Sequence, residues 1–446
     1  MKKKICLIIV VMILIMGGCT NKKENLPVTN TVSGITEDVT ESTLVLMLNS
    51  GQKIETDIST TVIVGGEELL IGSRVTLTYT GELDYLNIVQ FIKVEKINIT
   101  GQLSPDEMIA RRAQAIMTSM SLEEKVGQMF FVRYPGGTEN EAFEAIKNYG
   151  FGGVILFAKD IRNRTKSQLK EMITQSQAAS NKGIFVAIDE EGGTVVRISQ
   201  YSSYRSIPFW SPQDLYRKGG FDLIISDAIE KASLLKSIGI NVNLAPVADV
   251  STDPSDYINA RSFGDIAGKT AEYVKTIVDV MNNEGVGSVL KHFPGYGNNK
   301  DTHIGLAIDN RSYENFETSD FIPFIIGIMF GADSVMVSHN IIMSMDPDLP
   351  ASLSLKVNRI LRDELGFSGV IMTDELSMDA IRNYSYGKDP AVLAVLAGND
   401  LITTTDFVTQ IPNVISAVKN GEIKEDQINA SVVRILIWKL RLGILK

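Results

Sequence analysis

The sequence predicts an α/β protein in which a small all-β domain precedes a (β/α)8 barrel of the TIM type. From about residue 101 onward, eight short apolar runs alternate with longer amphipathic segments, which is typical of a parallel sheet covered by helices. Polar residues directly follow several of these runs, as they do at the active-site end of such barrels. Between residues 32 and 100, apolar and polar residues instead alternate with a period of two, which indicates half-buried strands.

Length and charge exclude some classes of protein. The 446 residues are enough for two or three domains. The formal net charge of -10 argues against nucleic acid as a partner, because phosphate binding needs a basic surface. Both cysteines, Cys6 and Cys19, lie near the amino terminus, so the body of the protein contains no disulfide framework.

The first residues have the pattern of a targeting signal. Three lysines precede the apolar run Ile5–Met16, which is short for a membrane-spanning helix, and Gly17-Gly18-Cys19 follows it. This resembles a bacterial lipoprotein signal, with residues 1–18 removed and lipid attached to the Cys19 sulfur. An uncleaved amino-terminal anchor is the alternative. In both cases we expect a membrane-anchored protein on the extracytoplasmic face, with residues 19–31 as a flexible tether.

Residues 32–100 are predicted to form a small β-barrel or sandwich of five or six strands. The expected strands include Thr43–Leu48, Lys53–Asp57, Val62–Val64, Arg74–Thr80 and Ile88–Val94. No cluster of residues here suggests chemistry. An accessory or spacer role is therefore favoured, with carbohydrate or cell-wall binding as the alternative.

Residues 101–446 are predicted to form the barrel. Ser104 and Ser121 each begin a capping-box pattern with glutamate three residues later, so a helix is expected after each. The eight apolar runs predict the eight strands. They are Met129–Val132, Gly153–Phe157, Ile184–Ile188, Val242–Leu244, Ser288–Leu290, Ser334–Val337, Val370–Met372 and Leu401–Thr403.

Charged and imidazole side chains follow four of these runs and should meet at one rim of the barrel. They are Asp189-Glu190-Glu191, Lys291-His292, Ser338-His339 and Asp374-Glu375. Lys291 also opens a Gly/Pro-rich stretch, KHFPGYGNNKDTH, that ends at His303 and is interpreted as a catalytic loop.

Seven motifs in order resemble glycoside hydrolase family 3, specifically its bacterial β-N-acetylglucosaminidase (β-hexosaminidase) branch. They are SLEEKVGQM (Ser121–Met129), IDEEGGTVVR (Ile188–Arg197), NLAPVAD (Asn243–Asp249), ARSFG (Ala260–Gly264), KHFPG (from Lys291), MVSH (Met336–His339) and GVIMTDELSM (Gly369–Met378). The resemblance covers roughly Gln102 to Lys446. The chain departs from the family pattern at Tyr296, where histidine is usual, and at Thr302, where serine is commoner.

The resemblance implies a retaining exo-β-N-acetylglucosaminidase that releases terminal β-linked N-acetylglucosamine. A lipoprotein outside the cytoplasmic membrane would meet this sugar in peptidoglycan fragments, so we expect muropeptides as the substrate and peptidoglycan turnover as the process. The resemblance assigns Asp374 as the nucleophile, in preference to its neighbour Glu375. Asp301-Thr302-His303 matches the family's Asp-x-His motif, which makes His303 the general acid/base. Asp301 is then expected to fix the tautomer of His303 and to favour its protonated form.

By the same resemblance, five residues bind substrate hydroxyls: Asp189, Arg197, Arg261, Lys291 and His292. For Arg197 and Arg261 a structural ion pair is the alternative, and His339 and Asp249 either line the site or brace it. Gly192-Gly193 indicates either close approach of the backbone to a ligand or a plain turn. No cofactor or metal is expected, because the histidines lack zinc-type spacing.

Two other functions remain open from the residues alone. The same site is compatible with a phosphorylase that transfers N-acetylglucosamine to phosphate, since a histidine acid/base does not repel the incoming anion. The other alternative is a catalytically silent wall-binding lipoprotein.

Overall fold

The structure, a computed structural model, describes residues 29–48, 50–64, 68–83, 87–89, 92–297, 299, 307–377, 381, 384 and 387–445. The chain divides into two compact units, Met1–Met108 and Ile109–Lys446. Each unit is described by itself below. Cys19 and the apolar run Ile5–Met16 lie outside the described residues.

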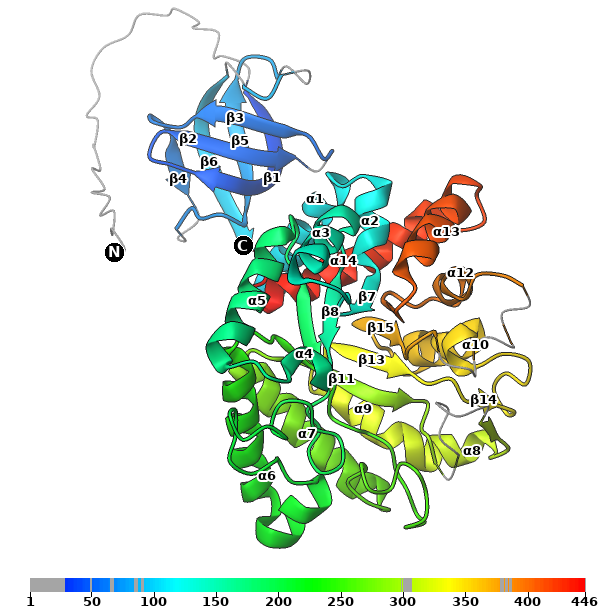
Figure 1. Ribbon diagram of the computed structural model, residues 1–446. Coiled ribbons are helices and arrows are strands. Elements are labelled where there is room, and N and C mark those ends of the chain that lie inside the picture. Colours follow the sequence, from blue (N-terminus) through cyan, green and yellow to red (C-terminus); the bar gives the residue numbers. More distant parts are fainter. Residues whose placement is uncertain are drawn as a thin grey trace, which may run out of the picture. The chain divides into compact units, whose positions relative to one another are not determined.

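The first unit contains one six-stranded sheet in the order β3-β2-β1-β5-β6-β4 (Figure 1). Its strands are β1 (Asn30–Val39), β2 (Thr43–Leu48), β3 (Lys53–Asp57), β4 (Val62–Val64), β5 (Ser73–Thr80) and β6 (Lys93–Gln102). Apolar side chains that alternate along β2 and β5, such as Leu44, Leu46, Val75 and Leu77, are buried in its core. This alternation is the physical reason why the strands were recognisable in the sequence.

Two details of this sheet differ from expectation. Strand β1 begins at Asn30, so the last two residues of the expected tether belong to the sheet. The expected strand Ile88–Val94 overlaps the observed strand β6 only at Lys93 and Val94, because β6 begins at Lys93. Ile88 and Val89 are more than half exposed, so this apolar pair did not mark a buried strand.

The second unit contains an eight-stranded parallel sheet in the order β15-β13-β11-β10-β9-β8-β7-β16. The strands are β7 (Phe130–Arg133), β8 (Gly153–Leu156), β9 (Phe185–Ile188), β10 (Val242–Asn243), β11 (Gly287–Phe293), β13 (Ser334–Val337), β15 (Val370–Thr373) and β16 (Ile402–Thr404). A parallel bridge between Met372 and Leu401 joins the two ends of this order and nearly closes the barrel. Each of the eight predicted runs overlaps one strand, so the predicted fold class is confirmed.

Helices follow the strands and surround the sheet (Figure 1). They are α1 (Pro105–Thr118), α2 (Leu122–Gln128), α3 (Glu139–Tyr149), α4 (Ala158–Ile161), α5 (Lys166–Ala179), α6 (Pro212–Ser237), α7 (Ala267–Glu284), α8 (Tyr313–Asn315), α9 (Phe321–Met329), α10 (Leu355–Arg359), α12 (Pro390–Leu396), α13 (Phe407–Lys419) and α14 (Glu425–Arg441), with the π-helical turns η2 (Phe316–Asp320) and η4 (Ile360–Glu364) and the 3-10 turn η3 (Ala351–Leu353). A short two-stranded sheet pairs β12 (Ile308–Asp309) with β14 (Ile341–Ile342).

The predicted helix starts at Ser104 and Ser121 are confirmed. The Ser104 hydroxyl accepts a hydrogen bond from the Glu107 amide, and the Glu107 carboxylate accepts one from the Ser104 amide. Ser121 and Glu124 repeat this reciprocal pair at the start of α2. Such a box satisfies amides that the first turn of a helix leaves without intrahelical partners.

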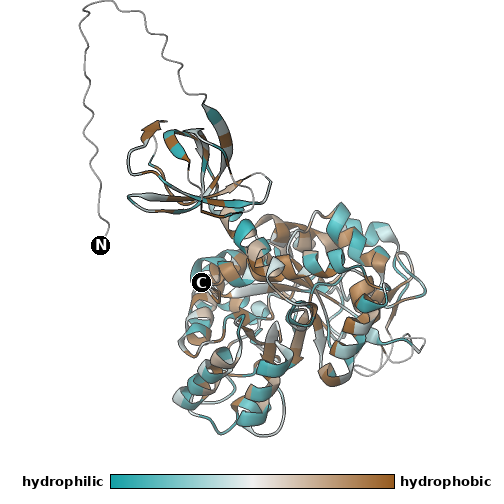
Figure 2. Cartoon of the chain, turned by 90° about the horizontal axis from the view of Figure 1, so that it is seen from above, coloured by the Kyte–Doolittle hydropathy of each residue, from teal (hydrophilic) through white to brown (hydrophobic). Residues whose placement is uncertain are grey.

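The barrel core is made by apolar side chains from the strands and from the helix faces that pack on them. The surrounding helices accordingly carry both hydrophobic and hydrophilic residues (Figure 2). Among the helices that the structure describes, none combines the length and the apolar character that a membrane crossing needs.

Candidate active site

Strand β11 brings two of the predicted site residues into the barrel wall. The sequence places Lys291 and His292 at the start of a loop, but both lie within β11. Lys291 pairs with Met336 of β13, and a register irregularity follows at His292. The sequence-based expectation is wrong here because β11 continues past the first charged residue that follows its apolar run. Polar partners inside the barrel satisfy both buried side chains, so the strand continues.

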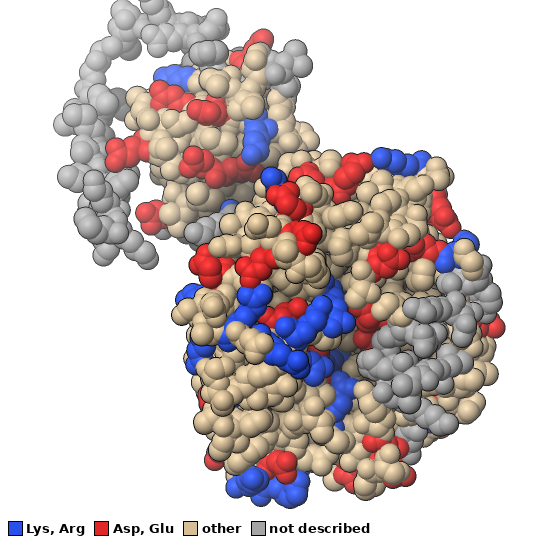
Figure 3. Space-filling view, in the orientation of Figure 1, with Lys and Arg blue, Asp and Glu red and all other residues tan. Residues whose placement is uncertain are grey.

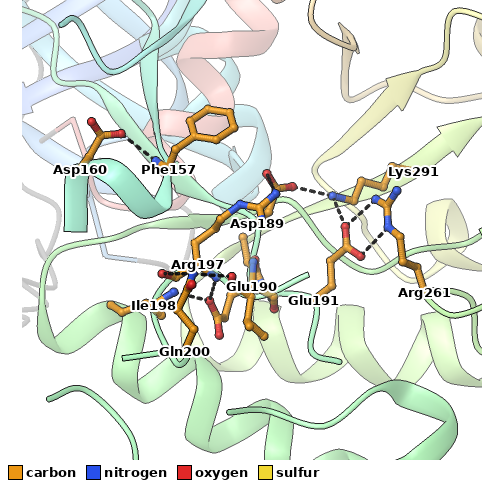
Figure 4. Close-up of polar contacts among 12 residues, drawn as sticks. Phe157, Asp160, Asp189, Glu190, Glu191, Arg197, Ile198, Gln200, Arg261 and Lys291 are labelled. Carbon is orange, nitrogen blue, oxygen red and sulfur yellow. Dashed lines mark hydrogen bonds and ion pairs between the residues drawn. The ribbon is translucent and has the colours of Figure 1, made fainter. Parts of the chain in front are cut away.

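Four charged side chains form one network at this rim (Figure 4). The Lys291 Nζ lies 2.7 Å from Asp189 Oδ1 and 2.6 Å from Glu191 Oε1. Arg261 binds the same Glu191 carboxylate through two bonds, from Nε at 3.0 Å and from Nη2 at 2.7 Å. This fork-to-carboxylate geometry is the strong form of an arginine ion pair.

The network fixes the charge of its members. Burial alone would raise the pKa of the Glu191 carboxyl, but the Lys291 and Arg261 charges hold that pKa well below its usual range. Burial likewise disfavours the Lys291 ammonium, yet Asp189 and Glu191 raise the pKa of Lys291. Glu191 and Lys291 are therefore both ionised at neutral pH.

His292 is oriented by a buried carboxylate. Asp249 is fully buried, and its Oδ2 accepts hydrogen bonds from the His292 amide at 3.0 Å and from His292 Nδ1 at 2.8 Å. The other ring nitrogen, Nε2, lies 3.3 Å from Arg261 Nη2. Because arginine only donates, these partners assign the proton to Nδ1 and make Nε2 the acceptor. Asp249 thus braces the site from behind His292.

The neighbouring acid Glu190 does not join the charged network and instead binds backbone amides. It is fully buried, and its carboxylate accepts hydrogen bonds from the amides of Arg197 and Ile198, each at 2.8 Å. It also bonds the Ser199 hydroxyl. Glu190 therefore holds the backbone of the loop that carries Arg197, and Figure 4 shows its contacts with Arg197 and Ile198.

Arg197 lies at the edge of the network. Its Nη2 is 3.9 Å from Asp189 Oδ2, and its side chain is 27% exposed. Its Nε is buried and has no hydrogen-bond partner among the described residues.

Gly192 and Gly193 have positive φ, and an added Cβ on either would meet the backbone around Trp210 and Ser211. Here the two glycines make a tight turn against the Trp210 segment.

Asp374 follows the last residue of β15 and is half-buried. Its amide donates to the Val337 carbonyl on β13 at 3.0 Å, and its Oδ1 accepts from the Glu375 amide at 2.8 Å. The Glu375 carboxylate instead accepts the backbone amides of Ser377 and Thr405, both at 3.1 Å. In the barrel order, β13 alone separates β15 from β11.

His339 supports the backbone beside Asp374. It is fully buried, its Nδ1 lies 2.7 Å from the Ser352 hydroxyl, and its Nε2 lies 3.0 Å from the Glu375 carbonyl oxygen. A carbonyl only accepts, so Nε2 carries the proton. His339 thus braces the strand end.

Asp301 and His303 lie outside the described residues. The backbone on both sides of them is anchored near the rim. The Tyr296 amide donates to Asp249 Oδ1 at 2.7 Å, and the Ala307 carbonyl accepts from the Ile341 amide at 2.9 Å. The described residues that flank Asp301 and His303 thus lie beside His292 on one side and beside the chain that leaves β13 on the other.

Sequence reasoning did not single out Glu191, which is the centre of the observed network. A signal was present, because Asp189 and Glu191 are two residues apart and side chains at that spacing in extended chain point to the same side. Both therefore reach Lys291, whereas Glu190 points away.

Among the described residues, no group of three His, Cys, Asp or Glu side chains is arranged to hold a metal ion.

The comparisons with known proteins agree with this architecture. The model of the glycosyl hydrolase family 3 N terminal domain matches residues 121–437. A beta-hexosaminidase of Nitrosomonas eutropha is 32% identical over 61% of this chain and 81% of its own length.

Two solved structures extend the likeness. A glycoside hydrolase family 3 beta-N-acetylglucosaminidase from Paenibacillus sp. is 31% identical, with a TM-score of 0.68 over 73% of this chain, and this chain spans 63% of its length. A beta-N-acetylhexosaminidase from Beutenbergia cavernae is 27% identical, with a TM-score of 0.61 over 71% of this chain and 98% of its own. The chain therefore belongs to glycosyl hydrolase family 3 and is a glycoside hydrolase.

Proposed function

We propose that the protein is a retaining exo-β-N-acetylglucosaminidase that releases terminal β-linked N-acetylglucosamine. The names of its relatives support the sugar. The observation that carries the proposal is the charged network of Asp189, Lys291, Glu191 and Arg261 on the same barrel rim as Asp374. In such a site the charged network binds the sugar hydroxyls through hydrogen bonds, and Asp374 places its carboxylate at the anomeric carbon.

The network retains open hydrogen-bonding positions for a sugar. Lys291 has three N–H donors and uses two of them on Asp189 and Glu191. Arg197 Nε is unpartnered among the described residues, and it sits beside Asp189, whose side chain is 16% exposed. A pyranose hydroxyl both donates and accepts, so Asp189 and Lys291 together match one hydroxyl. A site built this way discriminates strongly against analogues that lack the hydroxyl.

In the proposed mechanism, an Asp374 oxygen attacks the anomeric carbon while His303 protonates the leaving glycosidic oxygen. The bond from carbon to the leaving oxygen breaks as the bond to Asp374 forms. His303, now neutral, then removes a proton from water, which displaces Asp374 with overall retention. A reference pKa of about 6.5 lets histidine serve both steps near neutral pH, and Asp301 favours its protonated form.

The proposed natural substrate is a peptidoglycan fragment, met outside the cytoplasmic membrane by a protein anchored through lipid on Cys19. Lys and Arg side chains gather on the face of the second unit where α4 and β11 lie (Figure 3). Such a cluster of positive charge favours a sugar ligand that carries carboxylates in addition to its hydroxyls. The same observation favours phosphate as an alternative acceptor, which is the reason to keep phosphorolysis as the second candidate.

One assay separates these functions. The protein is given an aryl β-N-acetylglucosaminide with and without inorganic phosphate, and the sugar product is identified. Free β-N-acetylglucosamine as the first product at the same rate in both cases supports the hydrolase. A phosphate-dependent rate with sugar 1-phosphate as product supports the phosphorylase. No turnover in either condition supports the silent wall-binding alternative.

A further inference from the structure

A cavity of about 240 Å³ lies on the outside of the barrel, near the beginning of β15. It is bounded by α10 and η4, by α14, and by the chain that joins α12 to β16. Its volume far exceeds the ~10–15 Å³ that a single water needs. Asp374 and the rim network do not line it, so it is separate from the candidate active site.

Three arginines and two aspartates line this cavity: Arg359, Arg362, Arg434, Asp363 and Asp400. These groups sum to one positive charge, in a chain whose formal net charge is -10. A local excess of positive charge on an acidic protein points to an anionic ligand.

Asp400 neutralises only part of this charge. It is fully buried, and its Oδ1 accepts hydrogen bonds from Ser431 at 2.7 Å and Arg434 at 2.9 Å. Its Oδ2 accepts from Arg362 at 2.7 Å and from the Ile371 amide at 2.9 Å. Each carboxylate oxygen thus already accepts two bonds, which leaves Asp400 no capacity for a further arginine donor.

Some guanidinium donors of the lining arginines have no partner among the described residues, although Arg362 donates to Asp400 and to the Phe367 and Gly369 carbonyls. Arg434 uses only Nη1 on Asp400. Arg359 is exposed and makes no ion pair with any described residue. Burial lowers the pKa of Arg362 and the Arg434 charge lowers it further, although Asp400 opposes both effects. An anion in the cavity would relieve this repulsion.

Asn358, which also lines the cavity, has a buried amide oxygen that lacks a hydrogen-bond donor. Asn358 is 2% exposed, and its Nδ2 donates to the Ser354 carbonyl at 3.0 Å. Its Oδ1 accepts no hydrogen bond from any described residue. Buried polar atoms in proteins nearly always have partners, so an orphaned amide oxygen in a ligand-sized cavity indicates a missing donor.

We propose that this cavity binds a small tetrahedral oxyanion that carries a hydroxyl, namely inorganic phosphate or the phosphate group of a phosphorylated sugar. Arg359 and Arg434 clamp the anionic oxygens, since guanidinium groups match phosphate geometry. A phosphate or sugar hydroxyl donates to Asn358 Oδ1. The Ile371 amide that Asp400 holds belongs to β15, the strand that ends beside Asp374, so the occupied cavity adjoins a strand of the active site.

The test is isothermal titration calorimetry of the full chain with inorganic phosphate and, separately, with a hexose 6-phosphate, at constant ionic strength. Wild-type protein is expected to bind with saturable heat. Arg359→Gln should weaken binding about tenfold, because one charge-assisted pair is lost. Arg359 is exposed and unpaired, so this variant keeps its fold.

The matched control is Lys356→Gln, which removes the same charge from the same helix at a side chain that is 63% exposed and paired with Asp346 instead. It should change binding by less than about twofold. Arg197→Gln is the second control, because it alters the active-site rim and should leave anion binding unchanged. Tighter binding of the hexose phosphate than of phosphate identifies the sugar ester as the ligand, and equal binding identifies the free anion. The proposal is overturned if wild-type shows no saturable heat, if Lys356→Gln weakens binding as much as Arg359→Gln, or if Arg197→Gln abolishes it.

Discussion

The Lys291 ammonium lies 2.6 Å from the Glu191 carboxylate, and both side chains are only 2% exposed. Arg261 binds the same carboxylate with its Nη2 at 2.7 Å. One buried acid therefore balances two of the cations that we assign to sugar binding. Without it, Lys291 and Arg261 would repel each other in a site shielded from water.

Replacing Glu191 by glutamine should lower stability strongly. The change leaves two buried cations short of a counter-charge, and breaking a buried pair typically costs about 3–5 kcal/mol. The measurement is the free energy of unfolding from urea titration at pH 7. Glu230→Gln is the control, since Glu230 pairs with Arg205 but its side chain is 54% exposed, and such pairs are worth under about 1 kcal/mol. Equal losses in both variants would refute the central role of Glu191.

The same pair predicts the sign of an acid transition. The pKa of Glu191 is lower in the folded protein than its usual value of 4.5. Its contribution to stability is therefore fully present above about pH 4.5 and is lost as the pH falls through the folded pKa. Wild-type stability should fall more steeply below that pH than the stability of Glu191→Gln. Parallel curves for the two proteins over this range would contradict the assignment.

Asp333 should produce the opposite pH dependence. Burial raises the pKa of this carboxyl to about 6 from an ordinary 3.8, although the Ser288 amide opposes the shift. The folded state thus binds a proton more tightly than the unfolded state, and this group lowers stability as the pH rises from about 4 to about 6. Asp333→Asn should remove that decline, so its melting temperature relative to wild type should rise across this interval. A constant difference from pH 3.5 to pH 7 would show that the shift is absent.

Membrane attachment is predicted to depend on Cys19. Cys19→Ser expressed in a bacterial host should leave the membrane fraction and should lose incorporation of a labelled fatty acid, because the thiol is the proposed attachment point. Cys6→Ser is the control, since Cys6 lies within the segment proposed to be removed. Unchanged membrane recovery of the Cys19 variant would favour an uncleaved anchor.

Asp374 and Glu375 are distinguished by a pair of isosteric substitutions. Asp374→Asn should lower kcat by about three orders of magnitude or more, as expected when a nucleophile is removed. Glu375→Gln should have a much smaller effect on the chemical step, because that carboxylate is already bonded to the backbone amides of Ser377 and Thr405. Circular dichroism and melting curves check that both variants fold. A larger loss for Glu375→Gln would reverse the roles.

Strand positions were predictable from the sequence because all eight barrel strands are buried on both faces. Runs such as Val154–Leu156 and Val370–Met372 are continuously apolar, which no solvent-facing strand would be. Helix starts at Ser104 and Ser121 followed from local capping chemistry. The apolar pair Ile88-Val89 led to a wrong strand boundary because both side chains are exposed, so their apolar character does not indicate burial.

The site was predictable only in part. The sequence predicts five substrate-binding residues that the structure brings together around Glu191 and Asp249. They are Asp189, Arg197, Arg261, Lys291 and His292. The roles of Glu190 and His339 could not be read from the chain, and the spacing of Asp189 and Glu191 alone does not show that Glu191 pairs with both Lys291 and Arg261. They depend on contacts between segments far apart in sequence, such as the 2.7 Å contact between Arg261 and Glu191. Extension of β11 through Lys291 was hidden for the same reason.

The most direct measurement is to trap the protein with a slow fluorinated N-acetylglucosaminide and to map the labelled peptide by mass spectrometry. The account predicts a single sugar adduct on Asp374, formed in wild-type protein and in Glu375→Gln and absent from Asp374→Asn. An adduct on Glu375 or on any other residue, or turnover of the slow substrate with inversion and no adduct, would contradict the proposed mechanism.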